Sequence, residues 1–324
     1  MKLRIGSRGS QLALWQANHI AALLRGAGHE VEIEIIKTTG DRLQEVTFAQ
    51  VGVLTGSKGI FTKEIEEALV EGRVDLAVHS LKDLPTELPE PFVLAATPPR
   101  ADARDVFVSV RYKSLADLPA GARVGTSSQR RRAQLKSLRP DVEAVEFRGN
   151  VDTRLRKLAE GQVDAILLAA AGLDRLEKTE WVRERLEPKD FCPSAGQGSL
   201  GIETRKGDAA TIAAIAFLDD AATRFAVTAE RTALGALGGG CQVPVGIHCR
   251  VRPMEEWERA SGSRDYDEIF GVVAAPETGA AVRIFHRSPQ GETDPVTLGR
   301  LAAQMLLDAG AGPLLAAAAD GEFE

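Results

Sequence analysis

Two segments join an apolar strand pattern to a helix pattern through basic and hydroxyl side chains. They are Thr126-Ser127-Ser128-Gln129-Arg130-Arg131-Arg132 and Arg148-Gly149-Asn150-Val151-Asp152-Thr153-Arg154. Free backbone N–H groups and the positive end of a helix dipole attract anions, and guanidinium groups add charge-assisted hydrogen bonds. Each segment alone also fits a capped helix start with a solvated basic face. Cationic side chains in the first turn of a helix interact unfavourably with the helix dipole. The presence of two such segments therefore favours an anion-binding site.

A third segment places a lysine and a carboxylate at a strand end. Residues 74–85 run an apolar strand directly into His79, Ser80, Lys82 and Asp83. Ligands of open α/β sheets bind at the carboxyl ends of strands. A carboxylate there could stabilise a developing cation or move a proton. A surface turn with an ion pair is the alternative that this segment leaves open.

A single cysteine follows three glycines at Gly238-Gly239-Gly240-Cys241. Glycines adopt positive φ readily, so the loop can leave room for a large group on the thiol. A free cysteine is otherwise a small buried hydrophobe. Cys192 and Cys249 have no CxxC spacing with it, which argues against a disulfide framework and a structural zinc site. No metal site is predicted.

Composition narrows the class of protein. The chain has 324 residues, 44% hydrophobic and 27% charged, which is typical of a soluble protein of two or three domains. No apolar run approaches the roughly 18 residues of a membrane span, and residues 1–15 do not read as a secretory signal. The net charge of −6 gives no basic footprint for nucleic acid. We therefore expect a cytoplasmic protein with neither a membrane nor a nucleic-acid partner.

Strand and helix patterns alternate over the first two thirds of the chain. Expected strands cover 3–5, 31–36, 74–78, 105–110, 123–124, 144–147 and 164–169, and expected helices cover 10–25, 62–72, 129–138 and 152–160. The alternation indicates α/β layers with largely parallel sheets. Proline-containing breaks at 97–102 and 188–201 predict crossings between two such domains. A long helical region over 209–237, strands 245–251 and 269–274, and a helix at 296–309 predict a smaller α+β domain.

Seven motifs resemble those of the porphobilinogen deaminase family, also called hydroxymethylbilane synthases, and they occur in the family's order. They are SRGSQLALWQ, AVHSLKDLP, GTSSQRRRAQL, RGNVDTRL, ILLAAAGLDRL, GQGSLGIE and GGGCQVPVG. The resemblance implies a cytoplasmic, monomeric transferase of tetrapyrrole and heme biosynthesis. Such an enzyme joins four porphobilinogen molecules head to tail with release of ammonia, and hydrolysis then frees hydroxymethylbilane.

The resemblance also implies the fold. Two doubly wound α/β domains similar to type II periplasmic binding proteins would enclose the active site, and a smaller α+β domain would carry the cofactor cysteine. The expected division is 1–99 with 194–217, then 100–193, then 218–324.

The resemblance assigns roles to individual residues. Cys241 would hold a dipyrromethane cofactor as a thioether, and Asp83 would be the essential carboxylate, stabilising a cationic pyrrole from a buried position. Each pyrrole carries an acetate and a propionate, which require fixed cations. Cofactor contacts would come from Lys82, Asp83, Thr126, Ser127, Ser128, Arg130, Arg131, Arg148 and Gly149. Substrate contacts would come from Arg8, Ser10, Lys58, Phe61, Arg154, Arg175 and Gln197.

Two positions depart from the family pattern. The segment from Val51 reads VGVLTGSKGIFTKE and is several residues longer than the usual VGGKGLFVKE. In the family this segment is a lid, and the added residues would affect how it closes over the site. Asp152 is commonly a smaller residue, and its carboxylate near Arg148 is expected to weaken anion binding slightly. A non-catalytic two-lobed module that binds anions or solutes would explain the lobes and the basic junctions, but not GGGCQVPVG.

Overall fold

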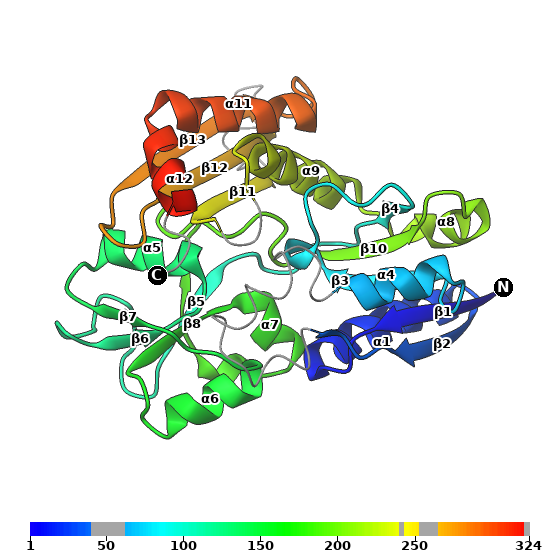
Figure 1. The fold of residues 1–324 in the computed structure, drawn as a ribbon, viewed down its shortest axis with the longest axis horizontal. Helices are drawn as coiled ribbons and strands as arrows, with labels where there is room; N and C mark the ends of the chain where they lie inside the picture. The colour runs from blue at the N-terminus through cyan, green and yellow to red at the C-terminus, as the bar shows by residue number, and fades with distance from the viewer. Residues whose placement is uncertain (40–61, 240–242, 253–264, 321–324) are drawn as a thin grey trace.

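The first domain is a five-stranded sheet with helices on both faces. A computed structural model describes residues 1–39, 62–239, 243–252 and 265–320. The sheet order is β2-β1-β3-β10-β4 (Figure 1). Its strands are β1 (Lys2–Ser7), β2 (Glu30–Ile35), β3 (Leu76–Ser80), β4 (Phe92–Ala96) and β10 (Leu200–Arg205). Strands β1, β2 and β3 are parallel, whereas β10 runs antiparallel between β3 and β4.

Alternation along β3 explains the two helix layers of this domain. Successive strand side chains point to opposite faces. Leu76 and Val78 join the core under α1 (Gln11–Gly26) and α8 (Ala209–Ile215), whereas Ala77 joins the core under α4 (Lys63–Val70). Both faces are therefore covered, as a doubly wound sheet requires.

The second domain repeats this plan. Its sheet order is β7-β6-β8-β5-β9, and β5 runs antiparallel between β8 and β9. The strands are β5 (Asp105–Val108), β6 (Arg123–Gly125), β7 (Glu143–Val145), β8 (Ala165–Ala169) and β9 (Val182–Leu186), and the helices are α5 (Gln129–Leu138), α6 (Val151–Ala159) and α7 (Ala170–Arg175). The prediction of two doubly wound α/β domains is confirmed. The sheets are mixed, because each receives its antiparallel strand, β5 or β10, just after the chain crosses into it.

The C-terminal domain packs two helices on an antiparallel sheet. Strands β11 (Val245–Arg252), β12 (Tyr266–Ala274) and β13 (Ala281–Pro289) lie under α9 (Ala221–Ala236) and α11 (Pro295–Asp308), followed by α12 (Ala311–Asp320). Helices α9 and α11 cross closely, since a Cβ at Gly299 would lie 2.4 Å from the Ala229 carbonyl oxygen. Among the described helices none alone is long and apolar enough to cross a membrane, and α11 with α12 passes only as a pair bent by 90°.

The helical region expected over 209–237 is divided into two α-helices. The chain forms α8, a 3-10 turn at Ala216–Leu218 and then α9. Asp219 and Asp220 interrupt the helix because their carboxylates accept backbone hydrogen bonds, from Thr97 N–H at 2.6 Å and from Thr223 N–H at 2.8 Å. The second of these bonds is an N-cap for α9.

A buried ion pair joins the three domains. Glu230 of α9 is fully buried and accepts from both terminal nitrogens of Arg100, at 2.6 and 3.1 Å. The same carboxylate accepts the N–H groups of Gly196 and Cys249, each at 2.7 Å. Arg100 lies on the first chain crossing, Gly196 on the second and Cys249 on β11. Burial would raise the pKa of Glu230, but Arg100 and His248 outweigh it and lower the pKa to about 2.

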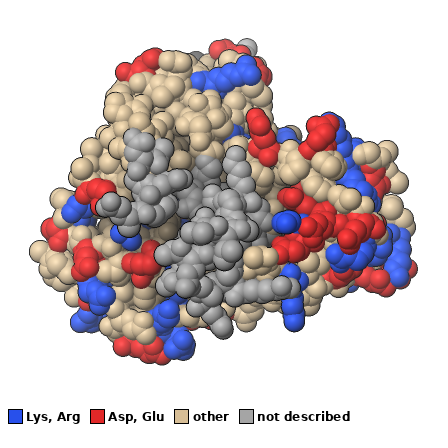
Figure 2. Space-filling view, in the orientation of Figure 1, with Lys and Arg blue, Asp and Glu red and all other residues tan. Residues whose placement is uncertain are grey.

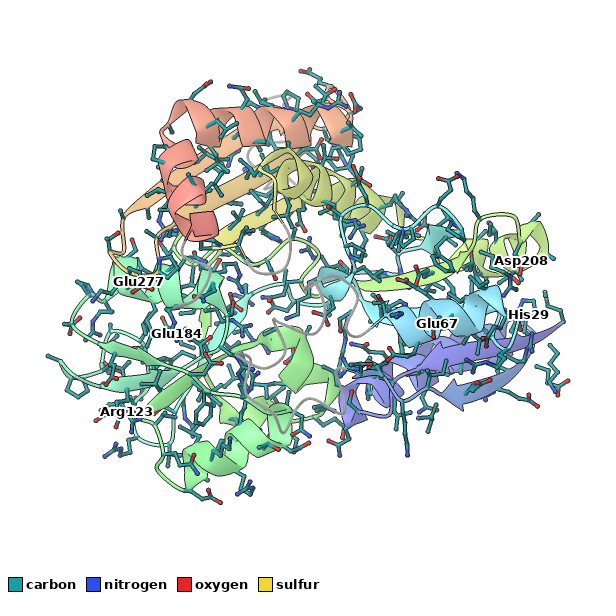
Figure 3. All side chains as sticks on the ribbon, viewed as in Figure 1. His29, Glu67, Arg123, Glu184, Asp208 and Glu277 are labelled. Carbon is teal, nitrogen blue, oxygen red and sulfur yellow. The ribbon has the colours of Figure 1, made fainter. Side chains whose placement is uncertain are left out.

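Charged side chains of both signs lie on the outer surface of the first two domains. Figure 2 shows acidic and basic groups interspersed on the first and second domains. Figure 3 shows Glu67 and Asp208 on the first domain, with Arg123 and Glu184 on the second, and side chains filling the spaces between the ribbons. An exposed pair from this surface, Lys206 with Glu90 at 2.9 Å, offers a control for the buried one.

Glu230→Gln is expected to lower the free energy of unfolding by about 3 to 5 kcal/mol, because it leaves Arg100, whose side chain is only 12% exposed, as an uncompensated cation. Urea denaturation measures the loss, and Glu90→Gln should change stability by less than about 1 kcal/mol. The folded pKa of about 2 lies below the ordinary value of 4.5, so this stabilisation is present above pH 4.5 and is lost as the pH falls towards 2. Equal urea midpoints for Glu230→Gln and the wild type at pH 7 would contradict this role.

Candidate functional site

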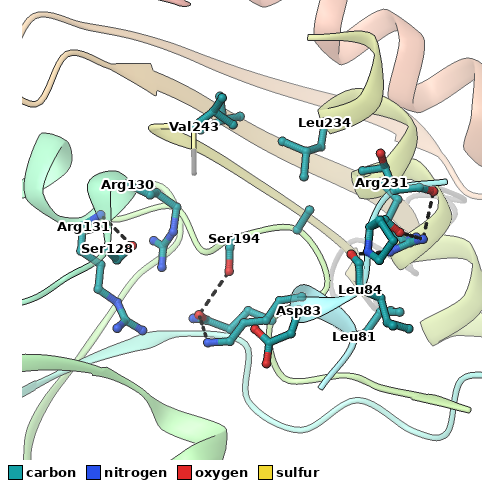
Figure 4. A pocket seen from close by; sticks show the side chains of 16 residues that line it. Leu81, Asp83, Leu84, Ser128, Arg130, Arg131, Ser194, Arg231, Leu234 and Val243 are labelled. Carbon is teal, nitrogen blue, oxygen red and sulfur yellow. Dashed lines mark hydrogen bonds between the residues drawn. The ribbon is translucent and has the colours of Figure 1, made fainter. Parts of the chain in front are cut away.

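One pocket is lined by all three domains. The first domain contributes the 3-10 turn η2 (Leu81–Asp83), and the second contributes Ser128, Arg130 and Arg131 (Figure 4). The second crossing adds Gln197 and Ser194, and the C-terminal domain adds Arg231, Leu234, Val243 and Val245. The site is therefore formed where the two chain crossings meet the third domain.

The sheet topology brings the predicted junctions together. Strands β1 and β3 are parallel, so Arg8 after β1 and Lys82 after β3 lie at the same edge of the first sheet. Strands β6, β7 and β8 are likewise parallel, so Thr126, Arg148 and the helix α7 follow strand ends at one edge of the second sheet. Ligands bind at such edges.

A buried carboxylate organises the cations of the pocket. Asp105 accepts from Arg130 at 2.6 Å and from Arg131 at 2.7 and 2.9 Å, and all three side chains are buried. Gln197 Nε2 donates to the same carboxylate at 3.0 Å. Burial would raise the pKa of Asp105, but the two arginines outweigh it and hold the pKa well below its usual range. Two cations against one carboxylate leave a net positive charge.

Lys82 lies beside this cluster. Its Nζ donates to Gln197 Oε1 at 3.4 Å. Burial, and then the charge of Arg131, lower the pKa of Lys82 to about 8. An anionic ligand beside this ammonium group would raise its pKa again, since a negative charge favours the protonated form.

Asp83 is exposed, so the expectation of a buried carboxylate is wrong. The η2 turn sends Leu81 and Leu84 inward to pack on Val227 of α9, and it leaves Asp83 at the pocket opening. Arg231 of α9 fixes the following segment by donating to the carbonyl oxygens of Pro85 at 2.6 Å and Thr86 at 2.9 Å. The carboxylate is thus positioned by two domains and remains accessible to a ligand.

Two further arginines are desolvated, and no carboxylate among the described residues is in hydrogen-bond contact with either of them. Arg154 reaches Ser127 Oγ at 3.5 Å, and its buried Nε has no hydrogen-bond partner within the described part of the chain. Arg175 donates to the Gly198 carbonyl at 2.7 Å and lies 5.7 Å over the Trp15 ring. Burial lowers the pKa of each guanidinium to about 10. These donors fit a ligand with several carboxylates, such as a dipyrromethane.

Other predicted contact residues, which carry hydroxyl groups, form hydrogen bonds at helix starts. Ser10 caps α1 through Ala13 N–H at 3.4 Å, and Ser128 caps α5 through Arg131 N–H at 3.4 Å. Thr126 accepts from Ser128 N–H at 3.2 Å. These bonds account for the hydroxyl groups structurally, and their contacts to a ligand stay predictions.

Two acidic residues lie at the second basic junction, and only one of them pairs with Arg148. Gly149 has a φ of +124°, and a Cβ there would lie 2.7 Å from Thr153 Cγ2, so glycine is required. Arg148 pairs with Glu146 at 2.5 Å. Asp152 instead pairs with Lys178 at 2.8 Å, so its carboxylate has its own cation.

Three predicted residues, Lys58, Phe61 and Cys241, lie outside the described residues, as does most of the longer segment that begins at Val51. Val243, two positions after Cys241, lies on the pocket wall (Figure 4). Cys192 and Cys249 are free and buried, and burial raises the pKa of each thiol. Neither has the thiolate character of a reactive cysteine.

The fold and the site define a two-lobed α/β protein with a pocket, completed by a third domain, whose cations suit a ligand with several carboxylates. A family model described as "Porphobilinogen deaminase, dipyromethane cofactor binding domain" matches residues 3–213, and "Porphobilinogen deaminase, C-terminal domain" matches 224–308. The chain belongs to the porphobilinogen deaminase family.

Curated relatives agree with the family models. Porphobilinogen deaminase from Nitratidesulfovibrio vulgaris is 48% identical, with 97% of this chain and 96% of that protein covered. The protein of that name from Trichlorobacter lovleyi is 48% identical at the same coverages. Among solved structures, the methionine-binding protein MetQ is similar at a TM-score of 0.43 and 12% identity, covering 67% of this chain and 89% of that one.

Lys82 is expected to react with an amine-directed acylating reagent at a lower pH than other lysines, because its pKa is about 8. Peptide mapping by mass spectrometry between pH 6 and pH 10, in the Cys241→Ser variant, gives the labelling midpoint of each lysine. Lys189 is the control, since its hydrogen bond and ion pair with Asp190 raise its pKa above 10.5. The same midpoint for Lys82 and Lys189 would show that the pocket does not desolvate Lys82.

Proposed function

We propose that the pocket between Asp83 and Arg131 is the site where porphobilinogen is deaminated and joined head to tail, four units in all, before hydrolysis to hydroxymethylbilane. Family membership carries the reaction and the dipyrromethane cofactor. The observation that supports the site is that Arg130 and Arg131, which both line the pocket, share the single carboxylate of Asp105. A solute-binding module without catalysis is the alternative, and the match to a cofactor-binding domain favours the enzyme.

The chain's cations would bind the carboxylates of the substrate and the cofactor. Arg131, Arg148 and Arg154 lie on the second domain, and Lys82 and Arg8 lie on the first. When bound, the dipyrromethane supplies the pyrrole carbon to which the first substrate unit is joined. Cations held before the ligand arrives orient it at little cost in side-chain entropy, because Arg131 is already fixed by Asp105.

Asp83 would stabilise the positive charge that develops on the substrate pyrrole when ammonia leaves. Its carboxylate lies at the pocket opening, and Arg231 fixes the backbone beyond it. A bound pyrrole would exclude water from this carboxylate, which strengthens its interaction with a cation.

Cys241 would carry the cofactor. Cys192 and Cys249 are buried and their pKa values are raised, which leaves Cys241 as the candidate thiol. Leu234 and Val243, which flank the 238–242 segment, both line the pocket. The attachment is supported by this position and by the family motif.

The pocket is formed by one chain alone, which supports a monomer. All three domains of one chain line the pocket, so a second copy is not needed to complete it. A cysteine reserved for a thioether, together with two free cysteines, suits a reducing compartment such as the cytoplasm. The proposed division remains 1–99 with 194–217, 100–193 and 218–324, and porphobilinogen is the proposed partner, with no nucleic acid or membrane.

The intact protein is expected to be heavier than its sequence by two linked pyrrole units, because a thioether survives denaturation. Mass spectrometry of denatured wild type and Cys241→Ser checks this, and the variant should lose both the added mass and the activity. Cys249→Ser is the matched control that keeps the adduct. An unmodified but active wild type, or an adduct on Cys192, would refute the assignment.

Asp83→Asn is expected to fold and to hold a preformed cofactor, yet to lower kcat by about 10²- to 10³-fold, because the amide has nearly the same shape without the charge. Turnover of verified holo-protein measures this. Asp117→Asn, at an exposed position of the second domain, should leave kcat unchanged. Near-normal kcat in Asp83→Asn would leave this carboxylate as a surface turn residue.

A further inference from the structure

We propose that a second pocket, between the sheet of the C-terminal domain and residues 188–192 of the second domain, binds a planar aromatic carboxylate. The pocket has a volume of about 490 Å³, within the range of small-molecule sites. Its walls include Lys189, Cys192, Phe270, Arg283 and Phe285. The proposal does not rest on the reaction in the main cleft.

The strand register places aromatic and basic side chains on one face of this sheet. Neighbouring residues across β11, β12 and β13 form three rows: Arg250, Glu268 and Arg287; His248, Phe270 and Phe285; and Gly246, Val272 and Arg283. Because strand side chains alternate between faces, these rows share the face opposite α9 and α11. The face packs on Ala133 and Cys192 of the second domain and opens beside them.

The second row provides an aromatic surface for a ring. The centroids of Phe270 and Phe285 lie 4.9 Å apart, and the Arg250 guanidinium lies 5.3 Å over Phe270. Phe285 is 50% exposed, although it is a large apolar side chain beside a pocket. A planar aromatic group would cover this ring and stack within the row.

The charge on the wall selects an anion. Glu268 is buried and accepts from Arg250 at 2.9 Å and from Arg287 at 2.7 Å, so those two cations are partly balanced. Arg283 differs, because its Nη2 is buried and has no hydrogen-bond partner among the described residues. The acidic group nearby, Asp190, pairs with Lys189 at 2.8 Å. A ligand carboxylate in the pocket would form a charge-assisted contact with the Arg283 guanidinium, which lines it.

Cys192 separates this pocket from the main cleft. Its Sγ contacts the Phe270 carbonyl oxygen at 3.6 Å, whereas its own carbonyl accepts from Arg130 at 2.7 Å. The second pocket therefore has its own aromatic and cationic groups. Ligands of the two pockets can be distinguished by variants that lie in only one of them.

Fluorescence anisotropy of pyrene-1-carboxylate, titrated with the holo-protein, tests the proposal. We expect saturable binding that Arg283→Met weakens at least about tenfold, as for the loss of one charge-assisted contact. Phe285→Ala, at a half-exposed position, should weaken it as well and serves if Arg283→Met does not fold. Arg300→Met, on the exposed side of α11, is the control and should bind as the wild type does.

Two further measurements show whether binding needs the ligand's charge and in which pocket it occurs. Pyrene-1-carboxamide should bind about tenfold more weakly than the carboxylate, because Arg283 needs the charge. Arg148→Met, in the main cleft, should leave the affinity unchanged. Absence of saturable binding, equal affinity for the amide, or a loss caused by Arg148→Met but not by Arg283→Met and Phe285→Ala would each overturn the proposal.

Discussion

The buried carboxylate of Glu230 determines how the three domains are arranged. Removing a carboxylate and the Arg100 guanidinium from water is costly, and the cost is offset only when every lone pair finds a donor. Here the donors come from both chain crossings and from β11. The crossings therefore cannot shift relative to the C-terminal domain without leaving a buried charge unsatisfied. The pocket is built on those two crossings, and it inherits their fixed positions.

Asp105 is a second buried carboxylate that fixes arginines, and these arginines line the pocket itself. It holds Arg130 and Arg131 in place but neutralises only one of their two charges. Arg154 and Arg175 are desolvated, and no carboxylate of the described residues is in hydrogen-bond contact with either of them. Burial, and then the charge of Arg131, lower the pKa of Lys82. A protein that leaves cations in this state is less stable alone than with a polycarboxylate bound. This imbalance connects the fold to the chemistry of pyrroles that carry acetate and propionate groups.

The sequence predicted the parts of the site that depend on local chemistry. Helix α5 begins after Ser128 as predicted, since capping is a local interaction. The two doubly wound domains followed from the alternation of patterns and from the motifs. Asp105, Arg231 and Glu230 were missed, because Arg130, Pro85 and Arg100, which they contact respectively, lie 25 or more positions away and nothing local distinguishes them from surface charges. The exposure of Asp83 depends on how Leu81 and Leu84 pack on α9, which no motif records.

A crystal structure of the holo-protein would show whether the cofactor's carboxylates pair with the cations that Asp105 leaves unbalanced. Continuous electron density is expected from Cys241 Sγ into the pocket beside Asp83. The carboxylates should lie about 2.7 to 2.9 Å from nitrogens of Arg131 and Arg154, the range of charge-assisted contacts. Density for the pyrroles elsewhere, or carboxylates that face solvent while these arginines keep only their present partners, would contradict it.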